Sequence, residues 1–239
     1  MAIKIIGIIK LALHLAFTVS LTHVYAVAAP TALIGQTDGV FFGGKWKFSK
    51  GWLALVQRDS SFSLEPTQIK FNKRLLPNES TYSEPACLYW SLHPDTRFLL
   101  RHQSLRAGKV EMLHLPDSGH QISYWDKRTP ASLKFFGSEY RFNLVHRGPN
   151  NPANTAADNR KVFIESQGRK TLLKDWNVDN GTDDNHERIV WAGDLDGDGR
   201  LDLIIVFTAY ASSTTCLFLS GAAGPGEVLR QVGCHYIGS

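Results

Sequence analysis

The segment GDLDGDGRLD, residues 193–202, decides the fold that we expect for the chain around it. It is preceded by RIVWA at 188–192 and followed by LIIVF at 203–207, two stretches rich in β-branched and aromatic residues. Such residues favour strands, whereas glycine and aspartate are typical of the turns between strands. The segment therefore predicts two strands joined by an acidic loop.

The aspartates of this loop are spaced as calcium ligands are. Asp194, Asp196, Asp198 and Asp202 occupy positions 1, 3, 5 and 9, and a glycine at position 6 permits a sharp bend. Oxygen ligands at alternate positions can turn toward one Ca²⁺ ion, and the carbonyl of Arg200 at position 7 adds a neutral ligand. Four carboxylates this close would repel one another without a cation. The spacing predicts a calcium site, and the alternative is a solvated turn rich in aspartate and glycine.

The loop and its flanking strands, residues 191–204, resemble the calcium loop of FG-GAP/VCBS-type repeats, which occur in integrin-like propellers and many exported bacterial proteins. The resemblance covers about residues 187–233, because LFLS at 217–220 and GEVL at 226–229 are similar to exported bacterial proteins with a single such loop. It implies Ca²⁺ held by the side chains of Asp194, Asp196, Asp198 and Asp202 and by the carbonyl of Arg200. Only one good copy is present, and a propeller needs several blades, so neither a propeller nor integrin-like adhesion is implied.

Apolar and polar residues alternate with a period of two through most of the chain. The alternation is clear in TQIKF at 67–71, KVEM at 109–112 and YRFNLV at 140–145, and it indicates strands with one buried face. Residues 161–174 predict a hairpin with Gly168 in its turn. We predict an all-β, mainly antiparallel fold, with a sandwich-like or partial-propeller-like body and the calcium loop between two strands.

Residues 1–28 predict a signal peptide. An apolar core at 11–21 follows Lys10, and small residues up to Ala28 provide a cleavage point. The alternative is an uncleaved membrane anchor, since the apolar stretch would nearly span a bilayer. Lys10 interrupts that stretch and favours cleavage, so we expect a periplasmic or secreted protein with no membrane span after cleavage.

The mature chain divides at a stretch rich in asparagine, proline and glycine, residues 146–155. This composition predicts an N-terminal β lobe at 29–148 and a C-terminal β lobe at 149–239 that contains the acidic loop. The alternative is a long surface loop within a single body.

Export bears on charge and on cysteine chemistry. The formal charge of the whole chain is +4, and loss of Lys4 and Lys10 leaves 24 basic and 22 acidic residues, a poor match for nucleic acid. Cys216 and Cys234 flank an expected hairpin and can form a disulfide in an oxidising compartment, or remain two buried free thiols. Cys87 is left over and is expected to be a small buried hydrophobe.

The chain carries no Gly-x-Ser-x-Gly elbow, no His-Glu-x-x-His and no phosphate-binding glycine loop. Its isolated acids are expected on solvated strand faces, with a glycosidase-like pair as the alternative; they are Asp59, Glu65, Glu111 and Glu139. Four histidines match no short zinc-ligand pattern: His93, His102, His114 and His120. Several aromatic residues are expected to pack between strands, with a sugar- or peptide-binding platform as the alternative: Trp46, Trp52, Trp90, Trp125 and Tyr124. A second, degenerate acidic loop is expected to be an ordinary surface loop rather than a metal site; it contains Asp175, Asn177, Asp179 and Asp183.

These patterns predict an exported, non-enzymatic β-protein with one structural calcium site, an envelope or surface module that binds a protein or glycan partner. The alternative is a secreted hydrolase acting on glycan or peptide, whose acids converge only in the folded chain. A pocket with two convergent carboxylates away from the acidic loop would favour the enzyme. A shallow surface with exposed aromatic residues would favour binding.

Overall fold

The computed structural model describes residues 34–35, 39–42, 51–72, 86–91, 95–113, 115, 132–146, 160–176, 186–209 and 212–238. Within this part of the chain there are sixteen strands and no helix, and the paired strands are antiparallel. The all-β, antiparallel, sandwich-like fold predicted from the alternating pattern is therefore confirmed. None of the described residues forms a helix with the length and apolar character needed to cross a membrane.

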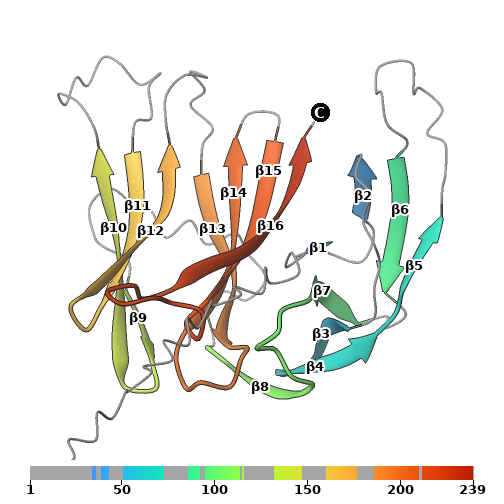
Figure 1. The fold of residues 1–239 in the computed structure, drawn as a ribbon, viewed down its shortest axis with the longest axis horizontal. Coiled ribbons are helices and arrows are strands. Elements are labelled where there is room, and N and C mark those ends of the chain that lie inside the picture. The colour runs from blue at the N-terminus through green and yellow to red at the C-terminus, as the bar shows by residue number, and fades with distance from the viewer. Residues whose placement is uncertain are drawn as a thin grey trace, which may run out of the picture.

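The largest sheet has nine strands and is strongly curled (Figure 1). Its strands, in spatial order, are β1 (Ile34–Gly35), β7 (Thr96–Leu100), β3 (Trp52–Arg58), β4 (Ser61–Thr67), β8 (Gly108–Met112), β13 (His186–Asp194), β14 (Asp202–Ala209), β15 (Ser212–Leu219) and β16 (Arg230–Gly238). Residues of the two outermost strands, β1 and β16, come within 8 Å of each other between Cα atoms. The curl therefore brings the two ends of the sheet close together.

Two smaller sheets flank the large one (Figure 1). One contains β12 (Arg169–Trp176), β11 (Arg160–Ser166), β10 (Ser138–His146) and β9 (Ser132–Phe135), and the other contains β2 (Gly39–Phe42), β6 (Ala86–Ser91) and β5 (Ile69–Asn72). The hairpin predicted at 161–174 is the β11–β12 pair. Its turn residues Gln167 and Gly168 both have positive φ, 50° and 74°, which is the backbone that a two-residue hairpin requires. This prediction is confirmed.

The strand β14, in the C-terminal half of the large sheet, is buried on both faces. In β14, Leu203 and Ile205 pack into a core shared with the four-stranded sheet. Ile204, which points to the opposite face, packs into a second core with residues of β3, β4 and β8, such as Leu55 and Leu64. All three β14 side chains are fully buried. The unbroken apolar run at 203–207 thus belongs to a strand that is covered on both faces. Alternation with a period of two does not reveal such a strand, because it marks strands with only one buried face.

The strand β8 joins the two parts of the large sheet by pairing with the end of β13, at Gly193 and Asp194. A Cβ on Gly193 would lie 2.2 Å from the carbonyl oxygen of Glu111 and 2.6 Å from the ring of Trp191. Only glycine permits this approach, because contacts so short do not occur between real atoms. Gly193 therefore allows β8 to close over the start of the acidic loop.

Cys216 on β15 and Cys234 on β16 lie directly opposite each other and form a disulfide, with 4.1 Å between their Cα atoms. The predicted bridge is confirmed, and the alternative of two free thiols is wrong. The cysteines are 18 residues apart, and closing a loop of this size stabilises a fold by about 3 kcal/mol. The bridge ties the edge strand β16 to the buried strand β15. Cys87 lies in β6 opposite Phe41, and its side chain is outside the described residues.

The sheets do not follow the expected lobe boundary at residue 148. β10 ends before this residue and β11 begins after it, yet the two strands pair from Arg141 with Glu165 to His146 with Arg160. The division into an N-terminal β lobe at 29–148 and a C-terminal β lobe at 149–239 stays a prediction. The predicted signal peptide at 1–28 lies outside the described residues.

Candidate metal site

The acidic loop connects β13 to β14, as predicted, and begins and ends on aspartates. Asp194 is the last residue of β13 and Asp202 is the first of β14. Between them, Gly197 and Gly199 have φ angles of 77° and 75°, a left-handed backbone that glycine adopts without strain. The two glycines let the loop fold back over its own carboxylates.

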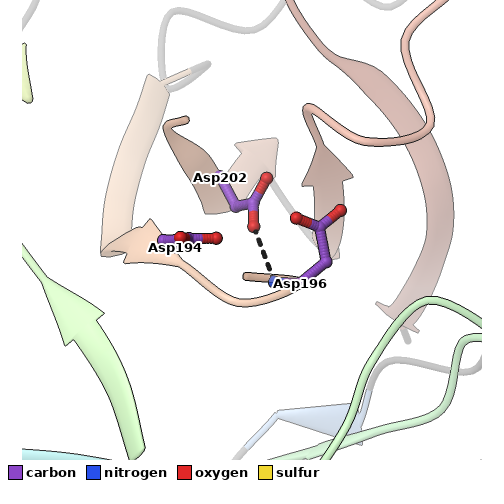
Figure 2. Close-up of side chains that lie close together, drawn as sticks. All are labelled: Asp194, Asp196 and Asp202. Atoms are coloured by element: carbon purple, nitrogen blue, oxygen red, sulfur yellow. Dashed lines mark hydrogen bonds between the residues drawn. The ribbon is translucent and has the colours of Figure 1, made fainter. Parts of the chain in front are cut away.

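Three of the predicted ligands meet at one point. One carboxylate oxygen from each of Asp194, Asp196 and Asp202 lies within 4.8 Å of the other two (Figure 2). Asp202 is completely buried, Asp194 is 8% exposed, and Asp196 is intermediate. This metal triad, as we call these three residues, could hold a metal ion.

Asp194 organises the backbone of the loop. Its Oδ1 accepts hydrogen bonds from the amides of Gly197, at 2.7 Å, and Asp198, at 3.1 Å. Its Oδ2 accepts one from the amide of Gly199, at 2.9 Å. These bonds satisfy three amides that the tight loop would otherwise leave unpaired, and they fix the direction of the carboxylate.

Asp202 connects the loop to a second turn of the chain. Its Oδ2 accepts a hydrogen bond from the amide of Leu195 at 2.7 Å, and its Oδ1 accepts one from the amide of Ser220, also at 2.7 Å. Burial raises the pKa of Asp202 to about 8, and the negative charge of Asp196 adds to the rise. The bonds from Ser220 and Leu195 oppose this rise only in part. In its ionised form the carboxylate is therefore held at a cost in free energy.

Asp196 is the triad member whose negative charge is least compensated by its neighbours. Both of its carboxylate oxygens are inaccessible to solvent and have no hydrogen-bond partner among the described residues. Burial raises the pKa of Asp196, and the charges of Asp198 and Asp194 raise it further. The amides of Asp198 and Gly221 offset part of this rise, although neither reaches hydrogen-bond geometry. A buried carboxylate with no partner is rare in folded proteins and calls for a ligand.

Asp198 and Arg200, the other two predicted ligands, lie beside the triad and pair with each other. The guanidinium of Arg200 donates to Oδ2 of Asp198 from Nε at 2.9 Å and from a terminal nitrogen at 2.5 Å. Asp198 is exposed and is not one of the three residues that converge. The same guanidinium donates to the carbonyl of Ser220 at 2.9 Å. The cation of the loop itself, Arg200, is thus paired with the carboxylate outside the triad.

Sequence reasoning missed three residues at this site. Ser220 and Gly221, in the turn after β15, contact the aspartates of the loop. Tyr140 of β10 accepts a hydrogen bond through its hydroxyl from the amide of Leu201, at 3.2 Å. No spacing rule connects these positions to the loop, because strand pairing brings them there. The only sequence signal was that LFLS at 217–220 belongs to the stretch that resembles other single-loop proteins.

Of the four isolated acids predicted on solvated strand faces, three lie on strands, each beside a base, and Asp59 lies in a turn. Glu65 pairs with Arg58, and Glu111 lies 3.1 Å from the amine of Lys109. Glu139 accepts a hydrogen bond from Arg141 at 2.8 Å. Asp59 is exposed in the turn after β3, with a φ of 54°.

The remaining candidates are only partly described. His102 is half-buried, and its Nδ1 lies 2.7 Å from the hydroxyl of Ser104; burial lowers its pKa. Trp52 is buried under the guanidinium of Arg101, 5.3 Å from the ring centre, so it packs rather than forming a platform. Asp175 pairs with Lys161 at 3.3 Å. The other candidate histidines and aromatic residues and the rest of the second acidic loop lie outside the described side chains; they are His93, His114, His120, Trp46, Trp90, Trp125, Tyr124, Asn177, Asp179 and Asp183.

Comparison of the chain with protein-family models, with curated proteins and with solved structures finds no match. The resemblance to FG-GAP/VCBS-type loops therefore stays a prediction that depends on residues 187–233. What the site can do follows from its own geometry: three carboxylates converge, two of the residues are buried, and the third carboxylate has no hydrogen-bond partner within the part of the chain that the structure describes.

Proposed function

We propose that the acidic loop holds a Ca²⁺ ion that fixes the turn between β13 and β14, in an exported β-protein that acts by binding rather than by catalysis. The observation that carries this proposal is the Asp196 carboxylate beside Asp194 and Asp202: both of its oxygens are inaccessible to solvent, and no described residue forms a hydrogen bond with them. A cation among the three would supply the missing partner.

The donor set favours calcium over other common ions. All the converging donors are carboxylate oxygens, the ligands of hard cations, whereas zinc prefers nitrogen and sulfur. Calcium binds oxygen at about 2.3–2.6 Å, so ligands on opposite sides of the ion lie up to about 5 Å apart. The triad oxygens lie within 4.8 Å of one another. Magnesium requires distances near 2.0–2.1 Å and a near-ideal octahedron, a stricter geometry than the flexible one that calcium accepts.

Charge balance supports the same conclusion. The triad brings three potential negative charges together, and the nearby guanidinium of Arg200 is paired with Asp198. Burial and mutual repulsion raise the pKa of Asp196 and of Asp202, which means that the ionised triad is unfavourable by itself. A divalent cation would make ionisation of the triad favourable, because it stabilises the ionised form of its ligands.

The proposed role of the ion is structural. Asp194 ends β13 and Asp202 begins β14, and the side chains of these two strands contribute to both hydrophobic cores. An ion between the ends of the two strands would hold the turn closed. Because ligand binding to the folded state alone adds to its stability, calcium should raise the melting temperature.

Export is supported by the Cys216–Cys234 disulfide, since such bonds persist mainly in oxidising compartments. It agrees with the signal peptide predicted at residues 1–28 and with a periplasmic or secreted location. A binding role, with a protein or glycan partner, is favoured over catalysis because the described acids outside the loop that were singled out as catalytic candidates lie beside bases or in an exposed turn.

The alternative function, a secreted hydrolase, draws on one observation. A cleft of about 500 Å³ is lined by Glu139 and Glu165, away from the acidic loop. Each carboxylate is paired with a base, Glu139 with Arg141 at 2.8 Å and Glu165 with Lys170 at 2.7 Å. The hydrogen bond from Arg141 lowers the pKa of Glu139, whereas a general acid needs a raised one. The cleft therefore supports the binding role better than the enzyme.

Calorimetric titration of the mature protein with Ca²⁺ tests the proposal. We expect saturable binding at one site and a higher melting temperature in calcium than in chelator. Asp196→Ala should abolish binding or weaken it by about a hundredfold, because it removes a charged ligand. Glu139→Ala, which removes an exposed carboxylate on β10, is the matched control and should bind calcium as the wild type does. No heat and no melting shift for the wild type would refute the calcium site.

A further inference from the structure

We infer that the turn Ser220–Gly221, which follows β15, is the second half of this metal site and determines its affinity. Ser220 is a positioning residue for Asp202 and Asp198, and Gly221 is the residue that leaves room for Asp196. This inference rests on the proposed calcium site and extends it from one loop to two. It concerns residues that lie outside the acidic motif.

Strand pairing brings the turn to the loop. β14 and β15 run antiparallel, with Leu203 opposite Phe218. Continuing this register by one residue on each strand places the start of β14, at Asp202, beside the end of β15. The residues that follow Leu219 must therefore pass over the acidic loop, although they are 18 or more positions away along the chain.

Ser220 fixes Asp202 with two groups at once. Its amide donates to Oδ1 of Asp202 at 2.7 Å, and its hydroxyl lies 2.9 Å from the same oxygen. Ser220 is 1% exposed, so water does not compete for these contacts. The other oxygen of Asp202 accepts the amide of Leu195. The Asp202 carboxylate is thereby held between two turns, in the orientation that brings it close to Asp194 and Asp196.

The hydroxyl of Ser220 also joins Asp198 to Asp202. It lies 2.9 Å and 3.0 Å from the two carboxylate oxygens of Asp198, and 2.9 Å from Oδ1 of Asp202. A hydroxyl has one proton to donate, so it cannot satisfy three anionic oxygens together. The hydroxyl is thus shared between two carboxylates, and each of them has a further donor: the guanidinium of Arg200 for Asp198 and the amide of Ser220 for Asp202. A cation in the triad would add positive charge beside this shared contact.

Gly221 makes the space that Asp196 occupies. A Cβ on Gly221 would lie 2.3 Å from Oδ2 of Asp196 and 3.1 Å from its Cγ. The φ of Gly221 is outside the left-handed range, so its backbone does not require glycine. The requirement is steric: any side chain here would push the Asp196 carboxylate out of the triad. Because the clash is with the free end of one side chain, the fold itself should tolerate it.

Three variants test the inference by calcium titration and by melting in chelator. Gly221→Ala should weaken calcium binding by about tenfold or more, since it displaces a charged ligand. Ser220→Ala should weaken it by about tenfold, the usual value of a hydrogen bond to a charged group. Gly224→Ala is the matched control in the same turn, because its Cβ would meet only the flexible ends of Arg230 and Glu227. It should bind calcium like the wild type.

The two readouts separate positioning from general stability. A residue with only a structural role would lower the melting temperature in chelator and leave the calcium affinity of the folded protein unchanged. For Gly221→Ala, a change on an exposed turn, we expect an unchanged melting temperature in chelator and a weaker calcium affinity. If Ser220→Ala does not fold, Gly221→Ala alone tests the inference. Wild-type affinity in both Gly221→Ala and Ser220→Ala, with binding abolished by Asp196→Ala, would overturn the inference and leave the calcium site standing. Absence of binding to the wild-type protein would overturn both.

Discussion

Acidic side chains gather at two places in the described structure, and their surroundings are opposite. In the metal triad, Asp194 and Asp202 are buried, and Asp202 has a pKa raised to about 8 by its burial. In the cleft where β10 begins and β11 ends, Glu139 and Glu165 are partly exposed, and each lies within 3 Å of a basic group. The pKa of Glu139 is lowered by its hydrogen bond with Arg141.

This difference indicates that charge compensation, rather than the number of acids, separates a candidate metal site from ordinary acidic residues. The cleft acids are already neutralised by neighbouring bases, and exposed pairs of this kind contribute little to stability. The triad acids have one another, backbone amides and the hydroxyl of Ser220 as neighbours. Their ionised form costs free energy in the absence of a cation. A fold that keeps such a cluster is expected to use it, and the carboxylate of Asp196 shows where the cation would lie.

The largest expected effect comes from Asp202→Ala. Removal of this carboxylate leaves the buried amides of Leu195 and Ser220 without an acceptor, and each unsatisfied group costs about 1–3 kcal/mol. We expect the free energy of unfolding in chelator to fall by about 2–5 kcal/mol, measured by chemical denaturation. Glu111→Ala, an exposed acid on the neighbouring strand β8, should change it by less than about 0.5 kcal/mol. Equal losses in the two variants would remove the contrast between buried and exposed acids.

An intermediate effect is expected from pH, and it should have opposite signs in the two regions. The pKa of Asp202 rises from 3.8 to about 8 on folding, so between these values the folded protein binds more protons than the unfolded one. Without calcium, the free energy of unfolding should therefore fall as pH rises through this window, by up to about 1.4 kcal/mol per pH unit. Glu139 has a lowered pKa, so its contribution is present above its ordinary pKa of 4.5 and is lost as pH falls.

Denaturation in chelator across this range measures the slope. Saturating calcium should flatten or reverse it, because the ion binds the ionised carboxylates and calcium affinity should increase with pH. Asp202→Ala should remove the part of the slope that comes from this group. A metal-free stability that rises steadily from about pH 4 to about pH 8 would contradict the burial effect at Asp202.

The smallest effect is expected in the cleft. The double variant Glu139→Gln, Glu165→Gln removes both ion pairs and should leave the free energy of unfolding almost unchanged, since ion pairs at the surface contribute little. Its calcium affinity should equal that of the wild type. A large loss of stability, or a change in calcium binding, would show that the two acidic regions are coupled.

Much of the fold could be predicted from local patterns. Alternation of apolar and polar residues depends on which strand face is buried, so it revealed strands such as β10 and the β11–β12 hairpin. It did not reveal that β14 is covered on both faces, because burial of Leu203 and Ile204 on opposite sides depends on which sheets pack together. Likewise, the pairing of β8 with β13 depends on the close approach at Gly193.

The candidate site, too, could be predicted only where it depends on local sequence. Spacing within one loop identified Asp194, Asp196 and Asp202, since ligands at alternate positions of a short loop can reach one centre. Spacing could not show that Asp198 pairs with Arg200, because that contact depends on the direction of the side chains. Nor could it identify Ser220, which the register of β14 with β15 brings to the loop. Long-range pairing is the information that local spacing lacks.

The most direct test of the account is a crystal structure of the mature protein grown in calcium, with anomalous diffraction used to locate the ion. We predict one anomalous peak bounded by Asp194, Asp196 and Asp202, with carboxylate oxygens at about 2.3–2.6 Å from it. The Asp196 carboxylate should then have the partner that it otherwise lacks. A well-ordered loop with no peak at this position, or a peak bound only elsewhere on the protein, would contradict the central claim.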